Sequence, residues 1–416
     1  MIPVTTPDPG YDVLIVGGGH AGAQAAAALR QHKFAGSIGI VSEETVLPYE
    51  RPPLSKEYLL GLKPRERLLL RAEHFWTERR IDLLLGRRVA AVDPAHSTVE
   101  TTAAERIRYG ELIWAAGGRA RRLSCSGGEL AGIHTIRSIA DVDQLKSELD
   151  RHHRAVVIGG GYIGLEAASS LRKLGKQVSL VESLDRVLSR VAGPEISAFF
   201  EAEHRARGVD VRLGCTVDCI EGRNGRVSDV RLVGGEVIPA DLVIVGIGIL
   251  PEVEPLLAAG AEGGNGVRVD EFCRTTLPKV FAVGDCALHV NPHAGVRAVR
   301  LESVQNATDM ATAVATTLSG HPTAYHAVPW FWSNQYDLRL QTVGLSTGYD
   351  QCVVRGDPAQ GSFSVVYLRD GEVIALDCVN ATRDYAQGRS LVAHRARIPI
   401  GQLADSQMPL SAPTPP

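Results

Sequence analysis

The segment that most constrains the fold lies at residues 12–22, where four apolar residues lead into a Gly-x-Gly-x-x-Gly turn and an alanine-rich stretch follows. A buried strand that runs through such a turn into a helix is typical of a dinucleotide-binding βαβ unit. Gly17 permits the tight turn, Gly19 lets the backbone approach a pyrophosphate, and Gly22 lets the helix pack on the strand. The helix N-terminus offers free N–H groups to the phosphates. The motif therefore predicts a dinucleotide site.

An acidic residue at the end of the next strand usually binds the ribose in such a unit. Here the apolar segment 37–41 is followed by Glu43 and Glu44. The segment thus supplies the strand, the helix and the acid that an accidental glycine pattern lacks.

The same plan occurs a second time further along the chain. Residues 155–158 lead into Gly159, Gly161 and Gly164, and a second strand ends on Glu182. Strand-rich sequence follows the acid in both halves, beginning in the first half with a strand expected at 81–85. In the second half we expect hairpin turns at Asn224-Gly225 and Gly234-Gly235. Two copies of one nucleotide-binding plan predict that the chain binds two dinucleotides.

Two adjacent dinucleotide sites suggest electron transfer between the two nucleotides. The usual pair is FAD with a nicotinamide, because a flavin accepts a hydride and can release electrons singly. In disulfide reductases with this duplicated plan, a redox-active cysteine pair follows the first acid, but residues 43–61 contain no cysteine. We therefore expect the flavin to pass its electrons to another protein or to a small acceptor.

The predicted fold class is α/β, with two Rossmann-like domains arranged as in glutathione reductase and a C-terminal α+β domain. A chain of 416 residues is too long for one compact core. We expect an FAD-binding domain at 11–117 and 249–323, an NAD-binding domain at 118–248, and a C-terminal domain at 324–416. The last of these is rich in aromatic residues and alternating strands.

Composition excludes several other classes of protein. A formal net charge of −3 argues against a nucleic-acid partner. The longest apolar run, at 242–250, is too short to span a membrane, and residues 1–10 lack the features of a signal peptide. The seven cysteines are scattered without a Cys-x-x-Cys pair, so we expect no metal site and a reducing, cytoplasmic location. The proline-rich residues 411–416 are expected to be loose.

Motifs spread in order over nearly the whole chain resemble the NADH-dependent ferredoxin reductases of monooxygenase and dioxygenase systems. They are Tyr49-Glu-Arg-Pro-Pro-Leu-Ser-Lys56, Gly159-Gly-Gly-Tyr-Ile-Gly-Leu-Glu166, Val283-Gly-Asp-Cys-Ala287, Arg300-Leu-Glu-Ser-Val-Gln-Asn306 and Val328-Pro-Trp-Phe-Trp-Ser-Asn-Gln335. The resemblance implies an FAD flavoprotein that oxidises NADH and reduces a two-iron two-sulfur ferredoxin. That ferredoxin would serve an oxygenase, for which a haem-thiolate monooxygenase is the first choice.

The resemblance also implies the residues that bind FAD. They are Gly17, Gly19, His20, Ala21, Gly22, Glu43, Arg51, Lys56, Val89, Arg137, Asp285 and Val304. Glu43 would bind the adenosine ribose, Arg51 a phosphate and Asp285 the ribityl chain. Lys56 would lie beside the flavin ring, where a cation favours the electron-rich reduced flavin.

The residues implied for the nicotinamide nucleotide are Gly159, Gly161, Tyr162, Ile163, Gly164, Glu166, Glu182, Gly248 and Glu302. Glu182 can accept from a ribose 2′-hydroxyl and would repel a 2′-phosphate, which favours NADH, although Arg186 lies close in sequence. Hydride transfer depends mainly on face-to-face placement of the two rings.

The three residues expected at the reacting rings are Lys56, Glu166 and Trp332. Trp332 resembles the family's tryptophan beside the flavin and the nicotinamide. We expect its neighbour Trp330 on the opposite face of the strand, packed in the core.

Two further features bear on the site. The family usually has Ala-Thr-Gly where this chain has Ala115-Ala116-Gly117, so a hydroxyl near the flavin is missing. Because ferredoxins are acidic, Arg297, Arg300 and Arg339 are candidates for a local docking face.

Two alternatives stay open. The apoptosis-inducing-factor-like proteins share the Arg-Pro-Pro-Leu-Ser-Lys motif, and they act mainly as redox-dependent interaction partners. An NADH oxidase, or a peroxide or disulfide reductase, would need a cysteine that is absent from residues 43–61.

Overall fold

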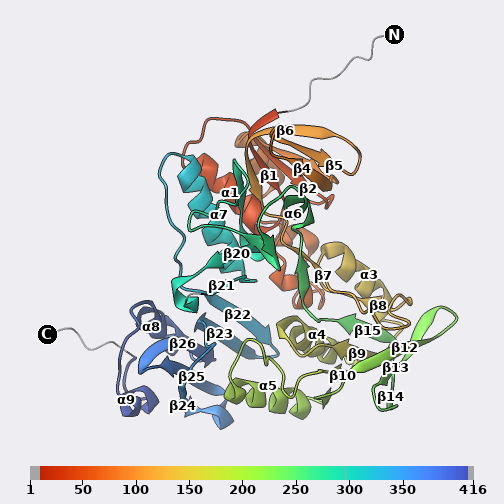
Figure 1. Ribbon diagram of the computed structural model, residues 1–416. Coiled ribbons are helices and arrows are strands. Elements are labelled where there is room, and N and C mark those ends of the chain that lie inside the picture. The colour runs from red at the N-terminus through yellow and green to blue at the C-terminus, as the bar shows by residue number, and fades with distance from the viewer. Residues whose placement is uncertain (1–9, 296, 411–416) are drawn as a thin grey trace. The chain divides into compact units, whose positions relative to one another are not determined.

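The computed structural model describes residues 10–295 and 297–410, and the predictions for the chain's two ends at 1–9 and 411–416 lie outside these residues (Figure 1). Backbone contacts divide the chain into two compact units. The first unit comprises the described residues up to Glu50, Glu66–Arg119 and Leu250–Pro329. The second comprises Arg51–Arg65, Ala120–Ile249 and the described residues from Trp330 onward. The segment Arg51–Arg65, which we expected in the FAD-binding domain, thus belongs to the second unit.

The first unit is built on a twisted sheet of order β3-β2-β1-β6-β5-β4, with β19 beside β6. Its strands are β1 (Gly10–Val16), β2 (Ile38–Ser42), β3 (Ile81–Leu85), β4 (Val89–Asp93), β5 (Thr98–Thr101), β6 (Arg106–Trp114) and β19 (Val280–Ala282). Strands β3, β2, β1, β6 and β19 are parallel, whereas β4 and β5 add an antiparallel ladder. Leu14, Ile40 and Ile113 are fully buried, as expected for parallel strands covered on both faces.

Helices α1 (His20–Gln31) and α7 (Val304–Leu318) pack against each other in this unit. Both helices are rich in alanine, which permits their close approach. The remaining elements are short: α2 (Glu73–Glu78), α6 (Glu254–Ala258) and a small sheet of β17 (Gly263–Gly264), β18 (Gly266–Arg268), β20 (Ala287–Val290) and β21 (Ala298–Val299).

The second unit repeats the parallel sheet in the order β11-β10-β9-β15-β8. Its strands are β8 (Ile133–His134), β9 (Arg154–Ile158), β10 (Gln177–Val181), β11 (Val209–Arg212) and β15 (Leu242–Val245). The helices are α3 (Ile139–Leu149), α4 (Tyr162–Lys173) and α5 (Pro194–Ala206), and the antiparallel strands are β12 (Val217–Arg223), β13 (Arg226–Leu232) and β14 (Val237–Pro239). The expected hairpin between β12 and β13 is confirmed, because Asn224 and Gly225 have φ of 53° and 78°.

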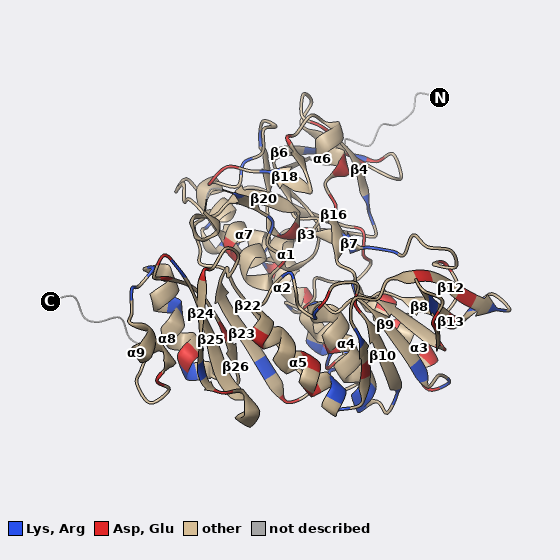
Figure 2. Cartoon of the chain, turned by 60° about the horizontal axis from the view of Figure 1, so that its bottom comes forward, with Lys and Arg blue, Asp and Glu red and all other residues tan. Residues whose placement is uncertain are grey.

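An antiparallel sheet of order β22-β23-β26-β25-β24 completes the second unit (Figure 2). Its strands are β22 (Trp330–Gln335), β23 (Leu338–Gly344), β24 (Gln351–Asp357), β25 (Ser362–Arg369) and β26 (Glu372–Val379). Helix α8 (Thr382–Ala393) packs on β23 and β26, and α9 (Ile400–Ala404) packs on β24. The buried Arg355 pairs with Asp384 at 3.0 Å and also donates to the Leu403 carbonyl, so it ties both helices to the sheet.

These sheets confirm the predicted fold class of two dinucleotide-binding plans and a C-terminal α+β part. The boundary between the NAD-binding and C-terminal domains inside the second unit stays a prediction.

The sequence analysis missed helices α3 and α5, although both carry helix-start signals. Ser138 and Asp141 form a capping box before α3, and Pro194 opens α5.

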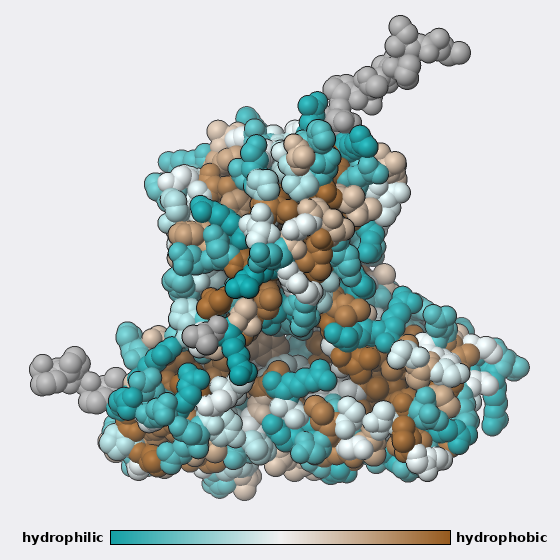
Figure 3. All heavy atoms as spheres, viewed as in Figure 1, coloured by the Kyte–Doolittle hydropathy of each residue, from teal (hydrophilic) through white to brown (hydrophobic). Residues whose placement is uncertain are grey.

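The exposed surface agrees with the composition. Across residues 10–295 and 297–410, no helix is long and apolar enough to cross a membrane. On the face drawn in Figure 3, hydrophilic side chains (teal) are interspersed with smaller apolar areas (brown).

A buried carboxylate lies in the middle of the C-terminal sheet. Asp377 on β26 is 3% exposed, and its Oδ2 accepts from the Tyr367 hydroxyl at 2.8 Å. The Tyr367 oxygen in turn accepts from the Gly193 N–H at 3.1 Å. Burial raises the pKa of Asp377 to about 7, and the Tyr367 hydrogen bond opposes this shift only in part.

Replacement of this carboxylate should therefore change how stability depends on pH. The pKa of Asp377 is higher in the folded than in the unfolded chain, so its ionisation costs folding stability as the pH rises from about 4 to 7. Asp377→Asn removes this cost. The Tm of the variant relative to the wild type should therefore rise over this range. The corresponding difference in the free energy of unfolding is at most about 4 kcal/mol. Thermal unfolding of both FAD-loaded proteins at several pH values measures it, and a pH-independent difference would contradict it.

Candidate active site

The first glycine turn joins β1 to α1, and two of its glycines are required by the fold itself. Gly17 has φ of +113°, and a Cβ built on it would lie 2.2 Å from the Ala115 carbonyl oxygen. A Cβ on Gly22 would lie 1.9 Å from the Gly17 oxygen. Only glycine permits these approaches of strand, helix and the segment after β6. The Ala115-Ala116-Gly117 segment, where the family usually has a threonine, therefore lies directly against the turn.

The third glycine of this turn is different. A Cβ built on Gly19 would meet no heavy atom within 4 Å, so the fold does not require glycine there. Gly19 is the N-cap of α1, and no described side chain caps the helix. Open space before uncapped N–H groups fits a pyrophosphate, which would occupy that space and accept from those N–H groups. His20 and Ala21 follow as the first residues of α1.

The second turn, between β9 and α4, repeats this geometry. Gly159 has φ of +106°, and its Cβ would lie 2.4 Å from the Gly246 oxygen. A Cβ on Gly164 would lie 1.9 Å from the Gly159 oxygen, whereas Gly161 faces open space. Both turns therefore fit a dinucleotide pyrophosphate on the same physical grounds. Gly248, with φ of +95°, lies just beyond β15 with open space at its own Cβ position.

The acids after the two turns are not in equivalent positions. Gly17 donates to the Val41 carbonyl and Gly159 to the Val181 carbonyl, both at 2.8 Å, so Ser42 corresponds to Glu182. Glu43 comes one residue later, and its side chain is 64% exposed and paired with Arg88 at 3.1 Å. Its role at the ribose stays a prediction, and Arg88 is a neighbour that the sequence did not reveal.

Glu182 is fixed beneath its glycine turn. Its Oε2 accepts from the Gly160 N–H at 2.6 Å, and its Oε1 accepts from the Leu184 N–H at 2.8 Å. The nearby Arg186 faces its own loop, because its guanidinium donates to the Ala192 carbonyl at 2.7 Å and to Ser197 Oγ at 2.6 Å. Arg186 is thus engaged within the protein, whereas the Glu182 carboxylate lies at the turn that would receive a nucleotide.

Arg300 organises the start of α7 in the first unit. Its Nη1 donates to the Asp285 carbonyl at 2.9 Å and pairs with Glu302 at 2.7 Å. The Arg300 side chain is only 10% exposed, so the prediction that it faces a docking partner is wrong. Val304, the first residue of α7, follows the capping Ser303. The structure therefore groups Asp285 with Glu302, although we expected them at different nucleotides.

The second unit contains a buried carboxylate with several donors. Glu166 on α4 is 2% exposed. Its Oε2 accepts from Lys56 Nζ at 2.6 Å and from Ser55 Oγ at 2.5 Å, and its Oε1 accepts from Ser333 Oγ at 2.7 Å. Lys56 is itself 9% exposed. A buried ion pair of this kind is stable only because both charges are hydrogen-bonded, so Glu166 is not a surface acid.

Aromatic side chains line the start of α4 and strand β22. Tyr162 stacks on Phe331 with ring centroids 4.5 Å apart, and burial raises the pKa of Tyr162. The ring centroids of Trp330 and Trp332 lie 5.7 Å apart. The expectation that they occupy opposite faces is wrong, because residues two apart in a strand share a face. Phe331 is the residue that points the other way.

The other predicted residues are distributed between the two units. Arg51 lies with Arg137 in the second unit, where its Nη1 donates to the Arg137 carbonyl at 2.6 Å. Val89 is buried in β4 of the first unit. Ile163, next to Tyr162 on α4, is 42% exposed. All of these site assignments stay predictions.

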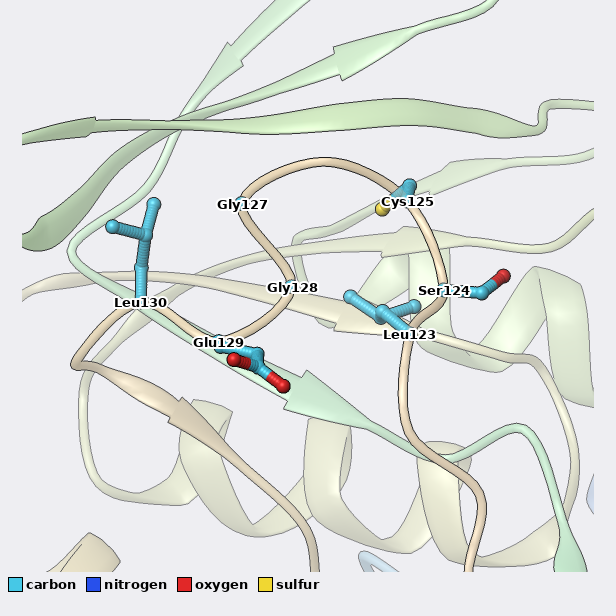
Figure 4. Close-up of a pocket in the computed structure, with 7 residues that line it drawn as sticks. All are labelled: Leu123, Ser124, Cys125, Gly127, Gly128, Glu129 and Leu130. Atoms are coloured by element: carbon cyan, nitrogen blue, oxygen red, sulfur yellow. The ribbon is translucent and has the colours of Figure 1, made fainter.

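The described residues also offer no competing centre. Among them, no group of three His, Cys, Asp or Glu side chains could hold a metal ion. The seven cysteines are all free thiols. A pocket at the loop before β8 contains none of the predicted site residues; it is lined by Leu123, Ser124, Cys125, Gly127, Gly128, Glu129 and Leu130 (Figure 4). The glycine turns and the Glu166 cluster therefore remain the candidate site.

Twin glycine turns on parallel sheets define a protein that binds two dinucleotides. Residues 11–311 match the family described as "Pyridine nucleotide-disulphide oxidoreductase", and residues 330–413 match "Reductase C-terminal". The chain belongs to the pyridine nucleotide-disulphide oxidoreductase family.

Curated relatives match almost the whole chain. The 5,5′-dehydrodivanillate O-demethylase ferredoxin reductase subunit of Sphingobium sp. (strain NBRC 103272 / SYK-6) is 60% identical and covers 97% of this chain and 98% of its own. Putidaredoxin reductase CamA of Pseudomonas putida is 39% identical, with 96% of each chain covered. The crystal structure of the covalent putidaredoxin reductase–putidaredoxin complex has a TM-score of 0.92 at 39% identity, with 97% of each chain covered.

The predicted enzyme class and cofactors are thereby confirmed: the chain is an oxidoreductase that uses FAD and NAD(H). Bound FAD supplies a group that accepts a hydride and releases electrons singly. The contribution of the chain itself is geometric and electrostatic. It leaves open space at Gly19 and Gly161 for phosphates, and it holds Glu166 and Lys56 as a buried ion pair.

The two kinds of glycine can be separated by substitution. Gly161→Ala places its methyl group in open space that we assign to the NADH pyrophosphate. It should raise the Kd for NADH at least about tenfold, since the phosphate contacts are displaced, and leave FAD content unchanged. Gly164→Ala should instead prevent folding, because its methyl group would meet the Gly159 oxygen. Titration of the flavin spectrum with NADH checks the first variant, and normal NADH affinity would contradict it.

Proposed function

We propose that this enzyme takes a hydride from NADH onto FAD and passes single electrons to a two-iron two-sulfur ferredoxin that serves an oxygenase. The observation that carries the proposal is the combination of two dinucleotide turns with a segment, 43–61, that lacks cysteine. Without a redox disulfide next to the flavin, electrons must leave for an external carrier. The names of the 60% and 39% identical relatives agree with a ferredoxin as that carrier.

Within this proposal, each residue of the buried cluster has a role. Lys56 places its ammonium at the N5/O4 edge of the flavin and stabilises the reduced ring. Glu166 holds Lys56 through the ion pair at 2.6 Å. Tyr162, which stacks on Phe331, orients the nicotinamide, since hydride transfer requires stacked rings. Trp332 lies on the other face of β22, so its role beside the rings stays a prediction.

The terminal oxygenase has two candidates. They are a haem-thiolate monooxygenase, which the motif resemblance puts first, and a Rieske dioxygenase. The 60% identical relative belongs by its name to an O-demethylase. Anaerobic stopped-flow mixing with NADH, followed by the host's ferredoxins and each oxygenase, distinguishes them. Rapid flavin reduction with electron transfer to a ferredoxin supports the proposal. Slow reduction with a long-lived charge-transfer complex would favour the interaction-protein alternative.

Glu182 should determine the preference for NADH. Its carboxylate is fixed at the turn and would repel a 2′-phosphate, whereas Arg186 is engaged in its own loop. Glu182→Gln should lower the ratio of kcat/KM for NADH over NADPH by about tenfold or more. Glu129→Gln, which removes the same charge from an exposed loop, is the matched control. Equal effects of the two substitutions, or an unchanged ratio in Glu182→Gln, would contradict this role.

Exposed arginines should support ferredoxin docking. Arg339 on β23 and Arg297 are both exposed. Helix α8, which packs on β23, also carries the exposed Arg383 and Arg389. Arg297→Ala and Arg339→Ala, singly and together, should raise the KM for ferredoxin severalfold, because basic charge steers an acidic partner. Ferricyanide reduction should not change, because this small acceptor needs no docking face. Equal effects on both acceptors would discard the role of these arginines in docking.

A further inference from the structure

We infer that Ser333, Gln335 and His204 form a buried hydrogen-bonded chain that positions the Glu166 carboxylate and, through it, the Lys56 ammonium. They are positioning residues, because none of them is assigned to a cofactor. The inference rests on the proposed function of Lys56 at the flavin. All of these residues lie in the second unit.

Helix α4 carries the polar residues of this arrangement on one face. Glu166, Ser169, Ser170 and Lys173 are spaced i, i+3, i+4 and i+7, which places them on one side of a helix. Two of these residues, Glu166 and Ser170, hold the segment of Ser55 and Lys56. Ser170 Oγ donates to the Ser55 carbonyl at 2.7 Å, while Glu166 accepts from the side chains of residues 55 and 56.

The same face of α4 also holds the turn between β22 and β23. Ser169 Oγ accepts from the Tyr336 N–H at 2.7 Å, and Lys173 Nζ donates to the Tyr336 carbonyl at 2.9 Å. These two bonds fix Tyr336 in a left-handed conformation with φ of 56°. Helix α4 thus ties the loop of Lys56 to the strand of Trp332.

The chain of donors runs in one direction, toward the carboxylate. The Ser333 hydroxyl donates to Glu166 Oε1 at 2.7 Å, so its oxygen accepts from Gln335 Nε2 at 3.3 Å. Gln335 Oε1 then accepts from His204 Nε2 at 2.9 Å, and His204 Nδ1 accepts from the Tyr336 hydroxyl at 3.3 Å. Every proton assignment follows from the first one, because an ionised carboxylate can only accept.

Burial reinforces this polarity. Ser333, Gln335 and His204 are each at most 1% exposed. Burial lowers the pKa of His204 to about 4, so the ring is neutral at pH 7 and has a single N–H, which Gln335 accepts. A chain whose donors all point toward Glu166 cannot be reversed without breaking each bond.

Removal of the Ser333 hydroxyl should therefore move Lys56. In this buried site Glu166 Oε1 would lose its donor and Gln335 Nε2 its acceptor, while Oε2 keeps Ser55 and Lys56. Any turn of the carboxylate toward one of these donors changes the position of the ammonium that it holds. We expect slower hydride transfer and a less stabilised reduced flavin, but unaltered NADH binding, since the glycine turn is untouched.

The test uses the FAD-loaded enzyme with NADH in anaerobic stopped-flow mixing. Ser333→Ala should lower the limiting rate of flavin reduction about tenfold, Gln335→Met less and His204→Phe least, because each is one bond further from Glu166. The Kd for NADH should stay within about twofold, and the flavin midpoint potential should become more negative. Ser333→Thr and His204→Gln retain the donors and should restore the rate.

Asn334→Ala is the control, because Asn334 precedes Gln335 on the same strand and points to the other face. An unchanged rate and potential in Ser333→Ala, or an equal loss in Asn334→Ala, would overturn the inference. If Ser333→Ala does not fold, Gln335→Met and His204→Phe test the same order of effects. A wild-type enzyme that NADH cannot reduce would refute the proposed function, whereas an active wild type with unaffected variants refutes only this chain.

Discussion

The close approach of helix and strand at each glycine turn is the constraint on which the rest of this protein depends. At both turns the last glycine lies so near the first that a methyl group would fall 1.9 Å from a carbonyl oxygen. This contact sets the direction in which α1 and α4 leave their sheets, and so it sets where their N-termini face. The predicted phosphate sites would follow from that direction, since uncapped N–H groups then face the open space at Gly19 and Gly161.

The two copies of the plan diverge at the acid, and this divergence has a physical meaning. In the second unit Glu182 takes the position under the turn and bonds the Gly160 N–H at 2.6 Å. In the first unit the small Ser42 takes that position, and a Cβ on Gly18 would lie 2.9 Å from its Oγ. The acidic residue of the first unit, the exposed Glu43, comes one position later in the sequence. One fold thus has a fixed carboxylate beneath one glycine turn and an exposed, arginine-paired carboxylate after the other.

The parts of this structure that could be predicted from sequence are those fixed by neighbours along the chain. The turns, the strand β3 and the Asn224-Gly225 hairpin depend on local spacing, and they were found. Arg300 was misplaced because its partners, the Asp285 carbonyl and Glu302, became visible only once the chain had folded. Ser333 and His204 were missed for the same reason, since their partners lie far away in sequence. The error at Trp330 was one of strand geometry and could have been avoided.

Helix α4 shows why buried polar residues of this kind are difficult to predict from a sequence. The spacing of its polar residues predicts the solvent-exposed face of an ordinary amphipathic helix. Glu166, Ser169 and Ser170 are nevertheless each at most 3% exposed. The face is polar because it contacts two other segments through hydrogen bonds rather than through apolar packing. Apolar packing would tolerate small displacements of the Lys56 loop, whereas a carboxylate with a donor on each oxygen permits only one arrangement. The role proposed for Lys56 at the flavin requires that directional accuracy, and it would give a reason for keeping a buried and costly ion pair there.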